Sequence, residues 1–461
     1  MPLLSKLGSS PAVEIPDVKA PPFARKQVLH KGEGTGREVS SQWGITIASK
    51  PLRGDQLARL AVLLTFCDPL PEQCLQMLAL STKDWSRLLC WLDVSGLALY
   101  FLNRLVELDL CDLLPSTVFT RLHLNLIDNA ERTRGMISES VAIQREFQRS
   151  GLSYAILKGL SLWPSSVPEP ELRLQFDLDF LVGQKSAREA RRILERRGYR
   201  LYAVNGRSWE FKLNERPGVS LKDIYKHMRS YAVELHVESS APDCLSPLDR
   251  LEWRELYDTS MPVLSPVDLF LGQGLHAYRH VCGEFSRASH LLEFRRHVLS
   301  RRDDKEFWTE LEWTVRNNPQ ASIGLGVVVH LITGVMGDFA PKALTRWTVD
   351  RLSAPVRLWV KMYGYRAVLG SHPGSKLHLL LQGELETEGI SVKRPVRRSL
   401  LPSQLPPMVI RAFPNEHLSL RLRRYSMQLH FVFDRMRFHI VEGLRFALES
   451  RRWRRIKRIA Q

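Results

Sequence analysis

Cysteine is scarce in this sequence, and no pair of cysteines has the spacing of a metal site. Only six of the 461 residues are cysteine, none forms a Cys-x-x-Cys pair, and no His/Cys cluster has zinc-finger spacing. Most lie among apolar neighbours, as Cys90 does between Leu89 and Trp91. These features argue against a disulfide scaffold and a zinc finger. They predict buried free thiols in a reducing compartment.

The sequence also lacks long hydrophobic runs. It has no uninterrupted apolar stretch of about 18 residues, the length that a membrane-spanning helix needs. Its first residues, Met1-Pro2-Leu3-Leu4-Ser5-Lys6, do not have the basic-then-apolar order of a secretory signal. We therefore expect no transmembrane helix and a cytoplasmic location.

Acidic residues are outnumbered by basic ones. The 66 Lys and Arg residues exceed the 49 Asp and Glu residues, which gives a formal charge of +17 and a pI near 9.8. Such a balance favours contact with an anionic partner: a nucleotide, a nucleic acid or an anionic membrane surface. A proteome that is rich in arginine throughout would give the same bias without any partner, so charge alone does not choose between these explanations.

The pattern along the chain divides it into six regions. A chain of this length can hold two to four domains. Pro, Gly and Ser dominate the first region, helical periodicity dominates most of the others, and alternating strands are concentrated in one of them. The predicted regions are a flexible leader (1–54), an N-terminal helical region (55–150), an α/β core (151–240), a second helical region completing a cleft (241–383), a linker (384–417) and a basic helical tail (418–461).

The most informative stretch is a predicted strand that carries two aspartates. Residues 176–182 alternate, so Asp177 and Asp179 project from the same face of the strand. Two parallel carboxylates cannot both stay ionised cheaply unless a positive charge lies near them. A divalent cation is the simplest such charge, because Mg²⁺ prefers oxygen ligands. A pair of solvated side chains at a strand end is the alternative.

A series of motifs surrounds this strand. The motifs are Leu157-Lys158-Gly159, then Arg173 with Asp177 and Asp179, then Gly198-Tyr199, and then Glu234-Leu235-His236. In this order they resemble a family of uncharacterised nucleotidyltransferases within the nucleotidyltransferase superfamily, over roughly residues 57–300. The resemblance implies an α/β fold (α+β) of polymerase-beta-like type, with a small mixed sheet embedded in N- and C-terminal helical regions.

The resemblance implies that three residues bind the nucleotide. The turn at Lys158 and Gly159 stands where the superfamily brings backbone N–H groups close to phosphates, and glycine permits that approach. Lys158 takes a position that is usually Gly, and it either supplies charge to a triphosphate or is an ordinary solvated lysine. Arg173 either binds phosphate or forms an ion pair with a nearby glutamate such as Glu169 or Glu171.

A third carboxylate is expected from the strand at residues 231–238. Glu234, His236 and Glu238 share one face of that strand. Glu234 matches the superfamily's third carboxylate best, and Glu238 is the alternative. His236 is expected to contact a ligand or the substrate rather than Mg²⁺, which prefers oxygen. A solvated polar face remains open as an explanation.

Two further histidines lie four residues apart on a predicted helix. His276 and His280 share a helix face, which suggests zinc, but no His-Glu-x-x-His pattern is present and no third ligand is evident from the sequence. Packing histidines are the favoured interpretation, and contact with the nucleotide or acceptor is a third. Arg287 and Glu293 stand where the family often has an Arg and an acidic residue, although Asp is usual at the second position.

The C-terminal region is predicted to form one or two helices that end in a basic segment. Residues 451–458 read Arg-Arg-Trp-Arg-Arg-Ile-Lys-Arg. A basic helix with Trp and Ile suits an anionic membrane surface or nucleic acid, and a solvated tail is the plain alternative. The sequence does not indicate the oligomeric state.

The function implied by these observations is Mg²⁺-dependent nucleotidyl transfer. An NTP would donate its NMP group to an unidentified acceptor, with Asp177, Asp179 and Glu234 as catalytic and metal-binding residues. Lys158, Gly159 and Arg173 would bind the nucleotide. The alternative is a non-catalytic nucleotide- or partner-binding module that associates with a membrane or a polysaccharide-synthesis complex through its basic tail.

Overall fold

A computed structural model describes most of the chain. It describes residues 54–460, except for 72–73, 76–77, 214–222, 227–230, 239–245, 257–258, 391–399 and 401–416. The predicted leader (1–54) therefore lies almost entirely outside the described residues. Most of the predicted linker (384–417) does as well.

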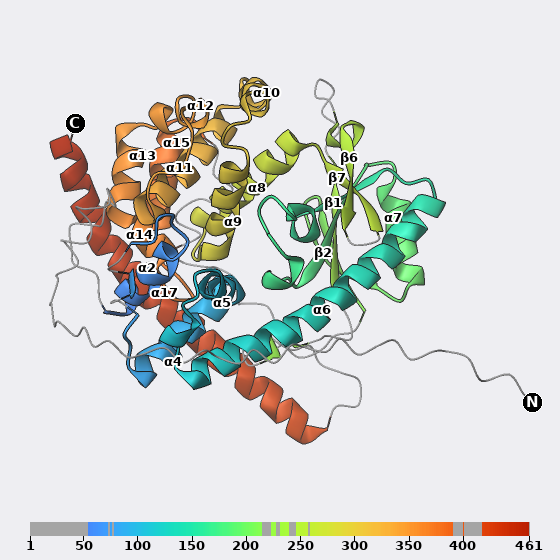
Figure 1. Cartoon of the computed structure of the whole chain (residues 1–461), viewed down its shortest axis with the longest axis horizontal. Coiled ribbons are helices and arrows are strands. Elements are labelled where there is room, and N and C mark those ends of the chain that lie inside the picture. The colour runs from blue at the N-terminus through green and yellow to red at the C-terminus, as the bar shows by residue number, and fades with distance from the viewer. Residues whose placement is uncertain are drawn as a thin grey trace, which may run out of the picture.

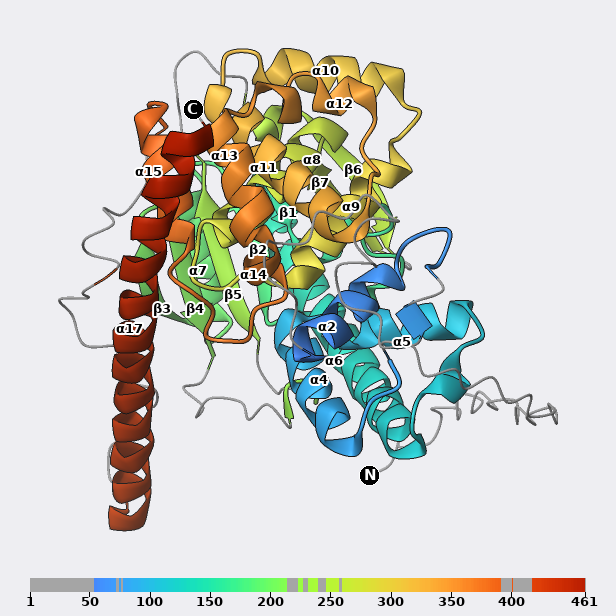
Figure 2. The same ribbon diagram turned by 90° about the vertical axis from the view of Figure 1, so that its left-hand side faces the viewer.

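The α/β part, with α6 (Ser116–Arg149) and α7 (Ala187–Arg196), lies on the right of Figure 1. Its centre is a mixed sheet of seven strands, labelled in Figure 2, in the order β3-β4-β5-β2-β1-β7-β6. Its strands are β1 (Tyr154–Leu157), β2 (Asp177–Val182), β3 (Arg200–Asn205), β4 (Ser208–Lys212), β5 (Ala232–Val237), β6 (Leu251–Leu256) and β7 (Thr259–Leu264). β2 runs parallel to β5 and antiparallel to β1, while β1 runs parallel to β7. The predicted mixed sheet within helical regions is confirmed.

One face of this sheet is apolar and is covered by two helices. Alternate residues of the central strands point to that face because side chains in a strand alternate between faces. They are Tyr154, Ile156, Leu178, Phe180, Val182, Val233 and Leu235. The helices α6 and α7 pack against them with Met136, Ile143, Phe147, Ala190, Ile193 and Leu194. The opposite face carries the polar residues of β2 and β5.

The sheet extends further along the chain than the sequence suggested. Residues after 241 were expected to be helical, but β6 and β7 form an antiparallel hairpin in which Leu256 pairs with Thr259. Apolar and polar residues alternate only weakly in these short strands, and β7 contains Pro262, a residue that is uncommon inside a strand. The sequence therefore lacks a strong period-two pattern here. The prediction of helix was therefore wrong for residues 251–264. The helix begins at Pro266, where Ser265 accepts a hydrogen bond from the backbone N–H of Asp268.

Helices precede the sheet in the sequence and follow it, and both sets are labelled in Figure 2. On the N-terminal side they are α2 (Gly54–Leu64), α4 (Thr82–Ser95) and α5 (Ala98–Glu107). After the sheet come α8 (Pro266–Val281), α9 (Ala288–Ser300), α10 (Lys305–Val315), α11 (Pro319–Met336), α12 (Lys342–Thr345), α13 (Ala354–Trp359), α14 (Tyr365–Val368), α15 (His378–Thr387) and α17 (Leu418–Ala460).

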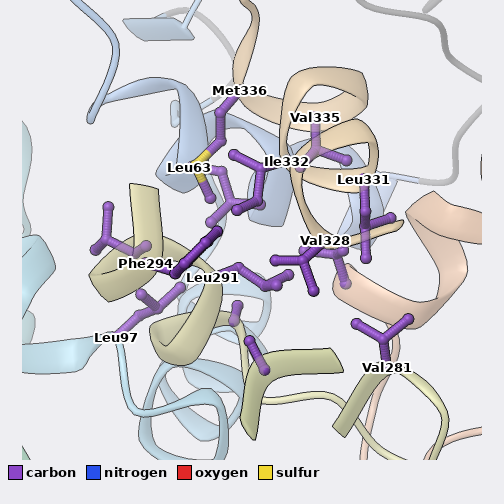
Figure 3. Close-up of a cluster of buried hydrophobic side chains, with 14 of the residues drawn as sticks. Leu63, Leu97, Val281, Leu291, Phe294, Val328, Leu331, Ile332, Val335 and Met336 are labelled. Atoms are coloured by element: carbon purple, nitrogen blue, oxygen red, sulfur yellow. The ribbon is translucent and has the colours of Figure 1, made fainter. Parts of the chain in front are cut away.

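Helices from both sides of the chain share one apolar core (Figure 3). Leu63 of α2, Leu97 before α5, Phe294 of α9 and Ile332 of α11 belong to the same buried cluster. Burying a side chain of this size contributes roughly 1.5–3 kcal/mol, so this shared core holds the N-terminal helices against those that follow the sheet.

Among the described residues, one continuous helix, α11, is long and apolar enough to cross a membrane. Its mean hydropathy is 1.5, although His330 and several glycines interrupt its apolar run. It is 67% buried inside the protein. It packs against α8, α9 and α2, as the central helix of a folded core does.

The basic tail forms one helix rather than two. α17 spans 43 residues, runs along the side of the helical region and extends well beyond it (Figure 2). Its C-terminal half is held to the body by hydrogen bonds from Trp453 to Glu384, at 2.8 Å, and from Tyr363 to Glu449, at 3.0 Å.

Candidate active site

The register of three neighbouring strands places two carboxylates side by side. Leu157 of β1 pairs with Asp179 of β2, and Asp179 pairs with Glu234 of β5. Residues that are directly opposite on paired strands project to the same face, a few ångströms apart. Asp179 and Glu234 therefore meet on the polar face of the sheet, next to the point where β1 ends.

Lys158 turns back into this acidic pair. It follows the last residue of β1 and has a φ of 49°, a left-handed conformation that is uncommon for a residue with a side chain. Its Nζ lies 2.7 Å from Oδ1 of Asp179 and 3.4 Å from Oε2 of Glu234. Burial opposes the charge on Lys158, but the two carboxylates outweigh it and raise the pKa of the ammonium group.

Gly159 continues the turn and leaves no room for a side chain. Its φ is 26°, and a Cβ placed there would lie only 2.1 Å from the side-chain amide of Gln175. Gln175 in turn donates a hydrogen bond of 2.6 Å to the carbonyl oxygen of Asp177. The glycine therefore lets the turn pack closely against the segment that leads into β2.

His236 and Ser208 complete the polar group. Nε2 of His236 lies 2.8 Å from Oδ1 of Asp179 and 3.3 Å from Oε2 of Glu234, and Ser208 donates a hydrogen bond to Glu234. These hydrogen bonds from His236 and Ser208 hold the pKa of Glu234 well below its ordinary value despite burial. Burial disfavours the charged form of His236, but Asp179 and Glu234 overcome this and raise its pKa.

The polar group has the composition of a cation site. Ligand atoms of Asp179, Glu234 and His236 lie within 4.8 Å of one another. Two carboxylates and one imidazole suit a divalent cation, and the Lys158 ammonium between them shows that the group accommodates positive charge. His236 was expected to contact a ligand or the substrate rather than the metal, and its Nε2 is part of this group.

Asp177 lies two residues before Asp179 in β2, at the edge of this group. It pairs with Ala232 rather than with an acidic residue, and it is outside the three-residue cluster. Burial, followed by repulsion from Asp179, raises its pKa from 3.8 to about 6, although Lys158 and Arg173 act in the opposite direction. The Asp177 carboxyl group therefore holds a proton more tightly than an ordinary aspartate does.

Arg173 forms a buried ion pair with a residue from a distant helix. Its Nε donates a hydrogen bond of 3.1 Å to Oε1 of Glu293 in α9, and the same oxygen accepts one of 3.0 Å from the hydroxyl of Tyr100. The partner is thus Glu293, not Glu169 or Glu171. Burial disfavours the charge on Arg173, but Glu293 outweighs it and raises the pKa.

Several of these residues line one cavity of about 620 Å³, whereas Asp177, Asp179 and Gly159 are not among its lining residues. The sheet contributes Lys158, Glu234 and His236, and the helices α8 and α9 contribute the opposite wall. Arg173 and Glu293 also reach this space. The described cavity therefore brings together the predicted residues Lys158, Arg173 and Glu234. Glu238 instead accepts a hydrogen bond from Ser246, which caps the 3-10 helix Pro247–Asp249 that precedes β6.

Three histidines lie on the helical wall of the cavity. The rings of His276, His280 and His290 have centroids 4.5–4.9 Å apart. Burial, with repulsion from neighbouring positive groups, lowers the pKa of His276 to about 2 and that of His280 to about 4. It also holds the pKa of His290 well below the ordinary value. Sequence reasoning found the first two histidines and missed His290, because only the packing of α9 on α8 brings it to them.

The sheet, its helical cover and the carboxylate group agree with the nucleotidyltransferase class that the motifs resemble. The model of a family described as uncharacterised nucleotidyltransferase matches residues 81–323, just over half of the chain. The chain belongs to that family. Membership supports a role in nucleotidyl transfer in general.

More distant comparisons add little. A solved structure, an antigenic nucleotidyltransferase-like protein from Paracoccidioides brasiliensis, is similar at 16% identity. The match covers 42% of this chain and 92% of that one, and its TM-score of 0.27 is too low to bear on the site. The comparison with curated proteins finds no match.

Proposed function

We propose that this protein transfers a nucleotidyl group from an NTP to an acceptor. The observation that carries the proposal is the register that sets Asp179 opposite Glu234, with the Lys158 ammonium in contact with both, where Lys158 and Glu234 line a cavity of about 620 Å³. In the reaction, a nucleophilic atom of the acceptor bonds to the α-phosphorus, and the bond from that phosphorus to the bridging oxygen of pyrophosphate breaks. The acceptor's proton passes to a carboxylate, and pyrophosphate leaves.

The residues present fit a Mg²⁺ site. Asp179 and Glu234 would hold the ion, because their carboxylates provide the oxygen donors that Mg²⁺ prefers, and His236 lies beside them in the same group. When bound, Mg²⁺ would neutralise charge on the triphosphate and polarise its phosphorus–oxygen bonds. Lys158 would then exchange its contact with Asp179 for one with a phosphate oxygen, and Arg173 would add positive charge from the cavity wall.

Different proton affinities suggest different roles for the carboxylates. Glu234, whose pKa is depressed by His236 and Ser208, stays ionised at physiological pH and suits cation binding. Asp177, with a pKa of about 6, binds a proton more readily than Glu234 and is not among the residues that line the cavity. We infer that Asp179 and Glu234 are the main ligands.

Nucleotide-dependent stabilisation tests this proposal. A ligand that binds only the folded state raises the melting temperature by mass action. Each of the four NTPs would be added with Mg²⁺ or with EDTA to the wild type and to the Asp177→Asn/Asp179→Asn variant, and only the ligand-induced shift would be compared. A Mg²⁺-dependent shift that the variant loses supports the site and reveals the donor nucleotide.

The second candidate function is a binding module without catalysis. No shift with any NTP would favour a partner-binding module. A shift without any NTP-dependent release of pyrophosphate across a panel of hydroxyl and amine acceptors would favour a nucleotide-binding module. Neither result would affect the description of the fold.

We also propose that α17 rests on an anionic membrane surface, which would make the protein peripheral to a membrane. Large apolar side chains on this helix are exposed: Leu429 and Leu448, for example, are 69% and 67% exposed. Exposed arginines are interspersed with them, at positions such as Arg423 and Arg437. Exposed leucine together with arginine suits an anionic bilayer, in which apolar groups insert while cations contact headgroups.

Vesicle sedimentation tests this second proposal. The full chain should bind vesicles that contain phosphatidylserine and not vesicles of phosphatidylcholine alone. A Leu422→Ser/Leu429→Ser variant should bind several-fold less, while Leu124→Ser, a change of an exposed leucine on α6, should bind normally. Equal binding by both variants would contradict the proposal, and binding to single-stranded nucleic acid but not to vesicles would assign the tail to the other anionic partner.

A further inference from the structure

The three histidines on the cavity wall form a compact group of nitrogen donors. His276 and His280 occupy positions i and i+4 of α8, and His290 lies in the first turn of α9. One ligand atom of each lies within 4.8 Å of the other two. No carboxylate or cysteine belongs to this group, which distinguishes it from the group around Asp179 on the opposite wall.

His290 is buried and incompletely satisfied. Its side chain is 8% exposed, and its Nδ1 has no hydrogen-bond partner among the described residues. A buried polar atom without a partner costs on the order of 1–3 kcal/mol, so such an atom in a native structure usually has a partner of another kind. The neighbouring rings of His276 and His280 face the same space, at centroid distances of 4.9 Å and 4.5 Å.

The surroundings of the group support ligand binding. The backbone of Phe285 lies close enough to the His280 imidazole to favour a proton on that ring, a contact of the kind that metal-binding histidines make with their surroundings. All three histidines line the cavity that also contains Lys158 and Glu234, so one side of the group is open.

We propose that His276, His280 and His290 bind a transition-metal ion of the Zn²⁺ class, with an open coordination position facing the cavity. Imidazole nitrogens suit Zn²⁺ and related ions, whereas Mg²⁺ prefers oxygen. Three protein ligands with a fourth position left open is the arrangement of zinc sites that bind a water or substrate. Nitrogen atoms in such a site lie about 3.3 Å apart, so side-chain movements of roughly 1 Å would bring the three imidazole nitrogens to that spacing.

The charges around the group favour an anion in the open position. Arg173 and Arg287 are near enough to act electrostatically on His290. These arginines oppose a bare cation but favour a metal ion that carries a negatively charged fourth ligand. A phosphate oxygen of a molecule in the cavity has that charge, so the site would hold a phosphate group opposite the carboxylates. The metal site itself does not depend on the proposed transfer reaction.

Metal stoichiometry tests this inference. Full-length protein without an affinity tag would be dialysed against Zn²⁺, and bound zinc would be measured by elemental analysis. Co²⁺ would then be titrated, because its visible absorption reports a four-coordinate nitrogen site. We expect one zinc per chain in the wild type, and at least tenfold weaker Co²⁺ binding in His280→Ala and in His290→Ala. Their melting temperatures would show whether each variant folds, and His280, the less buried of the two, provides the result if His290→Ala does not.

Two control variants make the result specific. His123→Ala removes an exposed histidine of α6 and should keep the metal. Asp179→Asn/Glu234→Gln disrupts the carboxylate group and should also keep it. Zinc below a tenth of an equivalent in the wild type, or zinc lost only in the carboxylate variant, would overturn the inference. Binding of inorganic phosphate in EDTA that His280→Ala abolishes would overturn it too, in favour of an anion pocket without metal. Failure of nucleotide binding would leave the zinc result unchanged, so the two proposals fail separately.

Discussion

The ammonium group of Lys158 lies 2.7 Å from Oδ1 of Asp179 and 3.4 Å from Oε2 of Glu234. The chain thus places its own cation among the carboxylates that are predicted to bind metal. The turn that begins at Lys158, with its φ of 49°, directs the side chain there. A metal ion that enters this group must compete with the ammonium, and a triphosphate offers the ammonium another anionic partner.

Removing this ammonium should therefore have opposite effects on metal and nucleotide. In the Lys158→Met variant, the affinity for Mn²⁺ without nucleotide should rise by about threefold to tenfold, since a competing charge worth roughly 1 kcal/mol is gone. The affinity for the Mg²⁺–NTP complex should fall. Calorimetric titration measures both quantities. Lys185→Met, which removes an exposed lysine, should change neither. Weaker Mn²⁺ binding in Lys158→Met would mean that Lys158 supports the metal rather than competing with it.

Asp177 should make the folded protein less stable above pH 6. Burial and then Asp179 raise its folded-state pKa from 3.8 to about 6, so between these values the folded chain binds a proton that the unfolded chain does not. Stability from this group therefore falls as pH rises through that window. Asp177→Asn should raise the free energy of unfolding by about 1–3 kcal/mol at pH 7.5 and by little near pH 4.

Denaturant melts at the two pH values check this prediction. Asp303→Asn, which changes an exposed carboxyl group, provides the control and should shift stability by less than about 0.5 kcal/mol. A loss of stability in Asp177→Asn at pH 7.5 would contradict the prediction. It would show that neighbouring groups stabilise the ionised Asp177 carboxylate in the folded protein.

The buried pair of Arg173 and Glu293 should respond strongly to loss of one charge. Glu293→Gln leaves the buried guanidinium without its counter-charge, and such changes cost about 3–5 kcal/mol. We expect a loss near the lower end, because the amide oxygen can still accept from Tyr100. Glu195→Gln breaks an exposed pair with Arg191 and should cost less than about 1 kcal/mol. Equal losses in the two variants, measured by thermal or urea unfolding, would contradict the burial argument.

Local patterns were sufficient to predict the strands of the site. Alternation in residues 176–182 and 231–238 predicted both strands and the faces of Asp179 and Glu234, because a strand has a fixed period of two. The direct opposition of these two residues could not be predicted, since register depends on how the strands pair. The contact between Arg173 and Glu293 spans 120 positions and arises only when α9 packs beside the sheet.

The histidine group also depends on a contact that local sequence patterns cannot predict. Helical periodicity placed His276 and His280 on one face of α8, but no local pattern connects them to His290 in the next helix. The strands at 251–264 were missed because their apolar alternation is weak and Pro262 lies in one of them. In both cases long-range packing decides the outcome.

The most direct test of the central claim is a calorimetric titration of the Mg²⁺ complex of the stabilising NTP into wild-type protein and Asp179→Asn. Asp179 touches Lys158 and His236 and pairs with Glu234, so its charge should be needed for the metal–nucleotide complex. We predict at least tenfold weaker binding in this variant, with Asp303→Asn unchanged and the wild type losing affinity in EDTA. Equal affinities for wild type and Asp179→Asn, in a variant with an unaltered fold, would contradict the assignment of this site.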